Sequence, residues 1–242
     1  MKRRSVAWIV ASGAGVVALG MGVPQAHAQS HAVAVRVAPA ANATSTTRAG
    51  YVLAHPPASA SAGDRFKVPT LTCPSTGTSG IALGAFIFTS SGLSGAEVTA
   101  GCSSGTAVYA GVLTVNGRTF AATFTPAAGD VIKALVSEST TATNTGLVDI
   151  TQSLGDDDGS TAGATNSAIL VGMHSLVSSS NTKLPLPPFG TERFTAGTID
   201  GGTVKASGAV AEDMTRHTRV LQIHTGALNS TGTAWSEIFR RS

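Results

Sequence analysis

The sequence predicts an all-β protein, an antiparallel β-sandwich of the concanavalin or jelly-roll type with two curved sheets. The first observation is a series of short runs rich in Val, Thr, Ile and Phe, separated by Gly, Ser, Asn and Pro. The second is the composition, in which 28 residues are Gly and only 12% are charged. Surface helices usually carry many Lys and Glu residues, so this composition favours strands joined by turns over alternating strands and helices.

The N-terminus carries the three parts of a secretory signal peptide. Residues 2–4 are basic, residues 6–23 form an apolar run, and Ala26-His27-Ala28 is a small-x-small cleavage site. A membrane anchor is the alternative, because the apolar run is near the lower limit for spanning a bilayer. The glycines in the run and the site that follows it favour cleavage. The prediction is a signal peptide over residues 1–28 and a secreted, extracellular protein that has no membrane contact after cleavage.

The exported part of the chain is predicted to have two regions. Residues 29–49 are rich in Ala, Val, Thr and Ser without amphipathic periodicity, so they are interpreted as a linker or propeptide that lacks order. From residue 50 onward, strand-like runs alternate with turn residues, so residues 50–242 are predicted to form the sandwich domain.

The best-defined local element is a β-hairpin. A strand over residues 109–115 leads into Asn116-Gly117, the dipeptide most suited to a type I′ turn, and residues 118–124 form the return strand. Residues 81–88 form a continuous apolar run of strand length, which is typical of a strand buried on both faces.

The remaining elements follow from shorter patterns. Residues 184–188 contain three prolines and are predicted to be irregular, whereas residues 209–215 are predicted to form a helical turn. The other predicted strands are residues 65–68, 131–136, 146–151, 168–171, 193–199, 204–206, 220–224 and 235–239.

The two cysteines, Cys73 and Cys102, are the only pair in the chain. In an oxidising compartment they are predicted to form one disulfide, which would restrict the unfolded chain by about 3.5 kcal/mol on the loop-entropy estimate. A catalytic or metal-binding thiol is the alternative. It is disfavoured because neither cysteine has a histidine nearby in the sequence and two cysteines alone do not make a zinc site.

Polar residues outside the cysteines give few indications of chemistry. The run Asp156-Asp157-Asp158 suits a calcium ion, but it lacks the ligand spacing of an EF-hand, and a solvated loop is the simpler interpretation. The histidines His174, His217 and His224 suit a metal or acid–base site, yet their wide spacing is more typical of surface or hydrogen-bonded histidines. No G-x-S-x-G motif is present. The sequence therefore predicts neither a metal nor a cofactor.

The charge distribution disfavours a nucleic-acid partner. The formal net charge is +3, and much of the positive charge lies at the two ends of the chain. No stripe of basic residues is interleaved with aromatic residues, as nucleic-acid-binding surfaces require.

Several segments, taken in order, resemble the bacterial branch of the glutamic peptidase (eqolisin) family, from about residue 50 to residue 239. Residues 66–73, Phe-Lys-Val-Pro-Thr-Leu-Thr-Cys, are similar to a family strand that reads Trp-x-Val-Pro-x-x-x-Cys. The other similar segments are Gly50-Tyr51-Val52, residues 102–110, residues 126–132, Ser167-Ala168 and residues 189–195. The resemblance implies two packed, curved antiparallel sheets with a substrate cleft on the concave face.

The resemblance also implies a chemistry, in which a Glu activates water as general base and a Gln stabilises the oxyanion. This sequence departs from the pattern at both places. The catalytic strand of the family reads Ser-Ala-Glu-Trp-x-x-Glu, and here Ile169 and Met173 occupy the positions of the two Glu residues. The family Gln corresponds approximately to Glu97, which is the one candidate catalytic residue. Small or aliphatic residues also replace family residues in residues 84–88 and 109–113.

Three functions are consistent with these observations, and the sequence leaves open whether the protein is an enzyme. The first is a secreted, glutamic-peptidase-like sandwich that is not catalytic and binds a peptide or protein ligand or serves a structural role. The second is an active acid endopeptidase with rearranged carboxylates, in which Glu97 acts with Glu138 or Asp149. The third is a module that binds carbohydrate or cell wall, which the small number of Trp and Tyr residues disfavours.

Overall fold

The computed structural model describes residues 41–90, 92–122, 124–139, 145–150, 156–160, 166–178, 180–216 and 220–240, and for residues 139, 145–150 and 156–160 it describes the backbone alone. Across these ranges the regular structure is β-strand, and no helix is long and apolar enough to cross a membrane. The strands are β1 (Ala43–Ser45), β2 (Arg48–Ala54), β3 (Ser59–Lys67), β4 (Thr78–Thr89), β5 (Gly92–Ser103), β6 (Thr106–Val115), β7 (Arg118–Ala121), β8 (Val131–Ser139), β9 (Thr145–Ile150), β10 (Asp156–Ser160), β11 (Asn166–Ser175), β12 (Thr191–Ile199), β13 (Gly202–Thr203), β14 (Val210–Thr215), β15 (Leu221–Thr225) and β16 (Trp235–Phe239).

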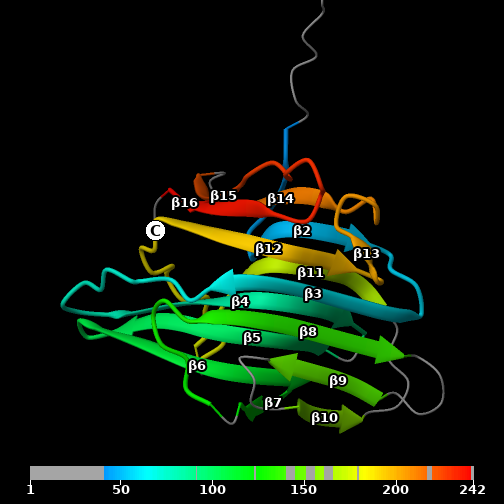
Figure 1. The fold of residues 1–242 in the computed structure, drawn as a ribbon. Coiled ribbons are helices and arrows are strands. Elements are labelled where there is room, and N and C mark those ends of the chain that lie inside the picture. The colour runs from blue at the N-terminus through cyan, green and yellow to red at the C-terminus, as the bar shows by residue number, and fades with distance from the viewer. Residues whose placement is uncertain are drawn as a thin grey trace, which may run out of the picture. The chain divides into compact units, whose positions relative to one another are not determined.

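The strands form a curled sheet that packs against itself as a sandwich (Figure 1). Its hydrogen-bonded path runs β10-β9-β8-β3-β12-β16-β15-β14-β2-β11-β4-β5-β6-β7, and the pairs along it are antiparallel. We call β2, β11, β4, β5, β6 and β7 the first layer, and β3, β8, β9, β10, β12 and β16 the second layer. Contacts of β3 and β8 with β4, and of β9 with β5 and β6, show that the two layers face each other. The predicted antiparallel β-sandwich is therefore confirmed.

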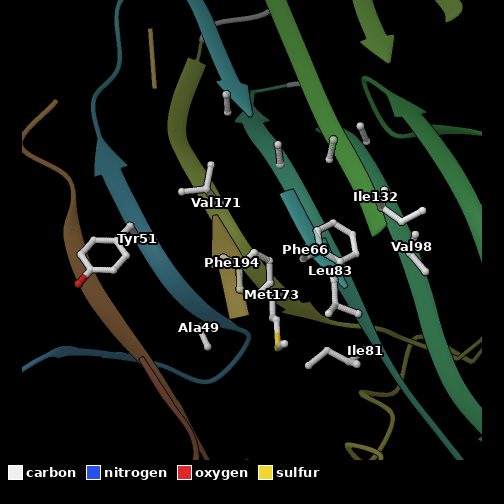
Figure 2. Packing of buried hydrophobic residues seen from close by; sticks show 14 of the residues in the cluster. Ala49, Tyr51, Phe66, Ile81, Leu83, Val98, Ile132, Val171, Met173 and Phe194 are labelled. Atoms are coloured by element: carbon white, nitrogen blue, oxygen red, sulfur yellow. The ribbon is translucent and has the colours of Figure 1, made fainter. Parts of the chain in front are cut away.

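The main core lies between the two layers (Figure 2). Phe66 of β3 and Phe194 of β12 are fully buried with their ring centroids 5.5 Å apart, and the Phe194 ring stacks on Trp235 of β16 at 5.2 Å. Leu83 and Met173 enter the same cluster from the first layer. Burial of each such side chain contributes about 1.5 to 3 kcal/mol, so this core is the main stabilising contribution to the fold.

The sequence correctly predicted the elements whose conformation depends on residues close together in the chain. The hairpin is formed by β6 and β7, and Asn116 (φ 46°) and Gly117 (φ 79°) have the positive φ angles that a type I′ turn requires. In β4 the side chains of residues 80–87 are buried on both faces, as the apolar run predicted. Residues 184–188 lie outside the strands, as their prolines predicted.

Three local predictions were wrong. Residues 209–215, predicted as a helical turn, form β14 instead, because their backbone groups pair with β2 on one side and β15 on the other. Residues Asp156–Asp158 lie in β10 rather than in a loop, since their backbone pairs with β9. Residues 204–206, predicted as a strand, form a turn that follows β13. Tertiary pairing overrides local propensity at the first two of these places.

The first strands of the sandwich lie within the region predicted to be a linker. Residues 43–45 form β1, which pairs in parallel with β14, and β2 begins at Arg48. Ala49 is fully buried because it faces the core between the layers. Pairing with β14 explains why these residues are ordered despite a composition typical of linkers. The predicted signal peptide and residues 29–40 lie outside the described residues.

Cys73 and Cys102 form the predicted disulfide, with their Cα atoms 5.4 Å apart. It joins the segment after β3 to the end of β5, and Cys102 is 1% exposed. The bond therefore fixes the segment that connects the second layer to the first.

Loss of this disulfide is expected to destabilise the protein. Replacing both cysteines with alanine should lower the free energy of unfolding by about 3.5 kcal/mol, because the bridged residues are 29 positions apart and the unfolded chain gains that loop entropy. Urea unfolding of both proteins, with and without a reductant, measures the effect. The reductant should destabilise only the protein with cysteines; an equal response of both proteins would contradict the prediction.

Candidate functional site

A second apolar cluster lies on the outer face of the first layer, opposite the main core. It contains Val52 of β2, Ala82 and Phe86 of β4, and Ala168 and Leu170 of β11. Successive side chains of a strand point to opposite faces, so the residues between these ones, such as Leu83 and Ile169, enter the main core instead. The outer face of β4 and β11 therefore carries a second, buried apolar cluster, and polar residues lie beside it.

Glu97 and His174 form a polar pair on this outer face. Glu97 lies in β5 between Ala96 and Val98, which both face the main core, so its side chain points outward. His174 comes from β11, two strands away, and its Nε2 lies 3.0 Å from Oε2 of Glu97. The Glu97 side chain is 6% exposed and that of His174 16%. The ring of Phe86 meets the imidazole edge to face, with centroids 4.7 Å apart.

The hydrogen bonds of His174 define how the pair holds its protons. Nδ1 lies 2.9 Å from the carbonyl oxygen of Ser175, and a carbonyl only accepts hydrogen bonds, so Nδ1 carries a proton. One further proton must then lie between Nε2 and the carboxylate of Glu97. The pair is an imidazolium beside a carboxylate, or a neutral imidazole that accepts from a carboxylic acid.

A row of three glycines crosses the first layer beside this pair. Gly50, Gly172 and Gly84 are neighbours in register on β2, β11 and β4, and the row continues to Glu97 on β5. Their φ angles are +136°, +141° and +152°, which side chains rarely adopt. A Cβ added at Gly84 would lie 2.1 Å from the carbonyl oxygen of Ala96. The neighbouring backbones therefore approach so closely that only glycine fits at these three positions.

The other end of the row is also occupied by a carboxylate. Glu212 of β14 pairs in register with Gly50 and accepts two hydrogen bonds from Arg48, at 2.9 Å from Nε and 3.2 Å from Nη2. The Arg48 guanidinium also lies 5.4 Å from the centroid of Phe88. The charge of Glu212 is thus neutralised by a bidentate ion pair with Arg48, whereas the hydrogen-bond partner of Glu97 is His174.

Ile169 and Met173, which occupy the positions of the two family Glu residues in the sequence resemblance, face the main core. Both are fully buried, and Met173 lies in the same cluster as Phe194 and Leu83 (Figure 2). Because they point inward, neither position lies on the side of Glu97. The outward-facing residues of β11 are Leu170, Gly172 and His174. The structure therefore brings His174, and not residue 169 or 173, to Glu97.

Glu138, suggested by the sequence as a partner of Glu97, lies on the other side of the first layer. It is 7% exposed and its Oε1 accepts a hydrogen bond from Ser94 Oγ, which enters the space between the layers. Burial raises the pKa of the Glu138 carboxyl, an effect that the Ser94 hydroxyl partly offsets. Glu97 and Glu138 are thus separated by the thickness of the sheet. Asp149, the other suggested partner, lies in β9, and its side chain is outside the described residues.

The remaining candidates from the sequence are dispersed. His224 lies beside Asp213, with Nδ1 3.2 Å from Oδ1, whereas His217 and the side chains of Asp156–Asp158 are not described. Within the described ranges, no three His, Cys, Asp or Glu side chains are grouped as a metal site requires.

The main feature that the sequence analysis missed is the pairing of Glu97 with His174. In the sequence, His174 is one of three widely spaced histidines. The alternation of β11, with Val171 and Met173 apolar and inward, indicates that His174 points outward, but only the register across β4 shows that it meets Glu97.

Loss of one partner of the pair is expected to destabilise the fold. Replacing Glu97 with alanine should lower the free energy of unfolding by about 2 to 3 kcal/mol, because a largely buried His174 then loses its hydrogen-bond partner. A double-mutant cycle with His174→Ala, measured by urea unfolding, isolates the interaction. Additive effects of the two substitutions would show that the two residues do not interact energetically.

Comparison with known proteins reveals the fold family. No protein-family model and no curated protein matches the sequence. Among solved structures, scytalido-glutamic peptidase with a peptide-based transition-state analogue is similar with a TM-score of 0.60 and 12% identity, over 81% of this chain and 100% of that one. SCP-B, a member of the eqolisin family in complex with the tripeptide Ala-Ile-His, is similar with a TM-score of 0.58 and 12% identity over the same shares. At this identity the likeness defines the fold alone, and the protein has the fold of the eqolisin glutamic peptidases.

Proposed function

We propose that this protein is an exported β-sandwich with the glutamic-peptidase fold that binds a peptide or protein ligand without hydrolysing it. The observation that carries the proposal is the environment of Glu97. Among the described side chains, its carboxylate is hydrogen-bonded to His174 and to no second carboxylate or carboxamide. Peptide hydrolysis by the mechanism that the family resemblance implies needs a general base and a separate oxyanion donor. Across the side chains that the structure describes, Glu97 therefore lacks the second residue that this mechanism requires.

The surroundings of Glu97 support a binding role. Around it the outer face of β11 and β4 is formed by Leu170 and Phe86, which are both fully buried, and by the glycine row. These surroundings supply little that could orient a water molecule, which favours binding over hydrolysis. Two of the similar solved structures contain peptide ligands or peptide-based analogues, which makes a peptide the first ligand class to test.

Export is part of the proposal. The N-terminal sequence has the parts of a signal peptide, and the disulfide is compatible with an oxidising compartment. Mass spectrometry of the protein recovered from the medium of an expressing bacterium tests it. A protein that begins after Ala28 is expected, and a cell-associated, uncleaved chain would contradict export.

The proposed lack of catalysis is tested by digestion of an unfolded protein substrate between about pH 2 and pH 7, the range in which carboxyl groups titrate. The purified protein is compared with Glu97→Gln, and folding and the disulfide are verified in the same samples. The expected result is no cleavage by either protein. Cleavage that disappears in Glu97→Gln would refute the proposal and make Glu97 a catalytic residue.

One observation favours a second candidate, an active acid endopeptidase. The 3.0 Å contact between Glu97 and His174 shares a proton, and such a pair is able to act as a general base toward water. In this case His174→Gln should abolish cleavage as fully as Glu97→Gln.

A carbohydrate-binding role receives less support from the structure. Trp235 is 3% exposed and Tyr51 is 6% exposed, because both pack in the main core, where their rings contact each other at 5.4 Å. The hydroxyl of Tyr109 donates to the carbonyl of Pro69. Sugar-binding surfaces need exposed aromatic rings, so a glycan screen is expected to give no binding.

A further inference from the structure

A groove of about 780 Å³ lies where the residues before β2, the segment before Pro185, the end of β14 with Arg216, and Gln222 of β15 meet. Its lining includes Thr47, Lys183, Thr215, Arg216 and Gln222, and neither Glu97 nor His174. None of its described lining residues is acidic. The groove is therefore a separate site from the polar pair on the outer face, with a different chemical character.

Two cations border the groove. Lys183 is half-buried, and its ammonium donates to the carbonyl of Thr46 and lies 3.4 Å from Oε1 of Gln222. Arg216 is exposed. Burial and the positive charge of Arg216 both lower the pKa of Lys183, which shows that the two cations repel each other. In the described part of the chain, the ion pairs involve other residues, so no carboxylate neutralises Lys183 or Arg216.

A buried amide adds neutral donors to the same groove. Gln222 is 4% exposed and lines the groove from β15. Its Oε1 is directed at the Lys183 ammonium, so its Nε2 group remains to donate.

Backbone hydrogen bonds hold the walls of the groove in place. Leu184 N donates to Leu176 O at 2.9 Å and Ser175 N donates to Thr47 O at 2.8 Å. Arg216 N donates to Val220 O at 2.9 Å, which fixes the end of β14 beside β15. The donors are thus carried by segments that are positioned before any ligand arrives, which reduces the entropy lost on binding.

We propose that this groove binds an oxyanion group, a phosphate or a carboxylate, between Lys183 and Arg216 with Gln222 as a third donor. Charge-assisted hydrogen bonds from ammonium and guanidinium groups are the strongest that such anions form. An anion at this position lies between two like charges and can accept a hydrogen bond from Gln222 Nε2. The groove is larger than a single anion needs, so the natural ligand carries the oxyanion group on a larger body.

Isothermal titration of the purified protein with inorganic phosphate and, separately, with acetate tests the site, at constant ionic strength. Saturable binding of at least one anion is expected, and the stronger of the two indicates the source of the oxyanion. Arg216→Gln should weaken binding roughly tenfold, as the loss of a charge-assisted hydrogen bond predicts. Because the Arg216 side chain is exposed and lacks an ion-pair partner among the described residues, this variant should fold normally.

Lys133→Gln is the matched control, because Lys133 is an exposed cation on β8 that does not line the groove. It should bind the anion like the unaltered protein. Absence of saturable binding, or an equal loss in Lys133→Gln and Arg216→Gln, would overturn the proposal. The titration does not depend on peptide cleavage or on Glu97, so its outcome is independent of the proposed function.

Discussion

Raising the pH from 4 to 8 is expected to lower the unfolding temperature of the protein, and Asp64→Asn is expected to remove a large part of that fall. Asp64 lies in β3 and is 2% exposed. Its neighbours on the same face of the strand, Ala62 and Phe66, belong to the main core, so the carboxyl points between the layers. Neither oxygen accepts a hydrogen bond of ordinary geometry.

Burial raises the pKa of Asp64 well above its usual range, and the nearby backbone amide of Gly172 offsets only part of this effect. A carboxyl group whose pKa is higher in the folded state binds more protons there than in the unfolded state. Stability is therefore fully present below the unfolded pKa of about 3.9 and is lost as the pH rises toward the folded value. The penalty for a buried ion is several kcal/mol, which corresponds to about 10 °C in a protein of this size.

Other buried carboxyls act in the same direction. Burial raises the pKa of Glu192 to about 7, despite hydrogen bonds from the backbone amides of Arg193 and Lys67 and the charge of Lys67. Burial also raises the pKa of Glu237 well above its usual range, although Thr225 and Trp235 donate hydrogen bonds to it. Both carboxyl groups therefore make the folded protein less stable as the pH rises, Glu192 over the range from about pH 4.5 to pH 7.

Thermal unfolding at intervals between pH 4 and pH 8 measures the effect for the unaltered protein and Asp64→Asn. The curves should converge near pH 4 and separate with rising pH, with Asp64→Asn the more stable. Asp200→Asn is the control, since Asp200 is exposed and the amide oxygen of Asn can still accept from Ser61 N. Parallel curves for all three proteins would show that Asp64 is not the group responsible.

Substitution of Gly84 by alanine is expected to lower the free energy of unfolding by about 4 kcal/mol or more. The added Cβ would lie 2.1 Å from Ala96 O and 3.0 Å from Glu97 Cα, both backbone atoms that cannot move without disturbing the sheet. The φ angle of +152° adds strain for any side chain. Urea unfolding, or loss of soluble protein where the effect is larger, measures the result.

Gly190→Ala is the matched control for this substitution. Gly190 also has a positive φ, +76°, but an added Cβ there meets no atom within 4 Å. Gly190→Ala should lower the free energy of unfolding by only about 1 to 2 kcal/mol, because only the left-handed backbone conformation disfavours a side chain there. Equal effects at the two positions would mean that the close backbone approach at Gly84 contributes nothing.

The parts of the fold that the sequence predicted are those set by neighbours along the chain. The Asn116-Gly117 turn depends only on the φ angles that these two residues adopt. The continuous apolar run of β4 indicates directly that this strand is buried on both faces. The disulfide was predictable because Cys73 and Cys102 are the only pair. For residues 209–215, local preference failed because β2, β15 and β1 supply the backbone partners that decide the conformation.

The candidate site depended on register between distant strands, which local patterns do not encode. Glu97 was selected from the sequence through a family resemblance, but its partner His174 is 77 residues away and meets it across β4. Gly50, Gly84 and Gly172 are unremarkable in a chain with 28 glycines until the pairing of β2, β11 and β4 places them side by side. Asp64 occupies an inward position of β3 that the alternation of Ala62 and Phe66 would have revealed.

The order of the strands also limits how molecules of this protein can associate. The two ends of the hydrogen-bonded path, β7 and β10, lie on the same side of the sandwich, where β10 contacts β6 (Figure 1), while β14 and β15 close the other side. The open edges at the two ends of the hydrogen-bonded path are therefore gathered at one side. The sequence of β10 contains three aspartates, so two copies meeting by this strand would repel each other, whereas β7 begins with Arg118. Edge pairing between copies is therefore disfavoured for β10 on β10, whereas the opposite charges of the two strands favour pairing of β7 on β10.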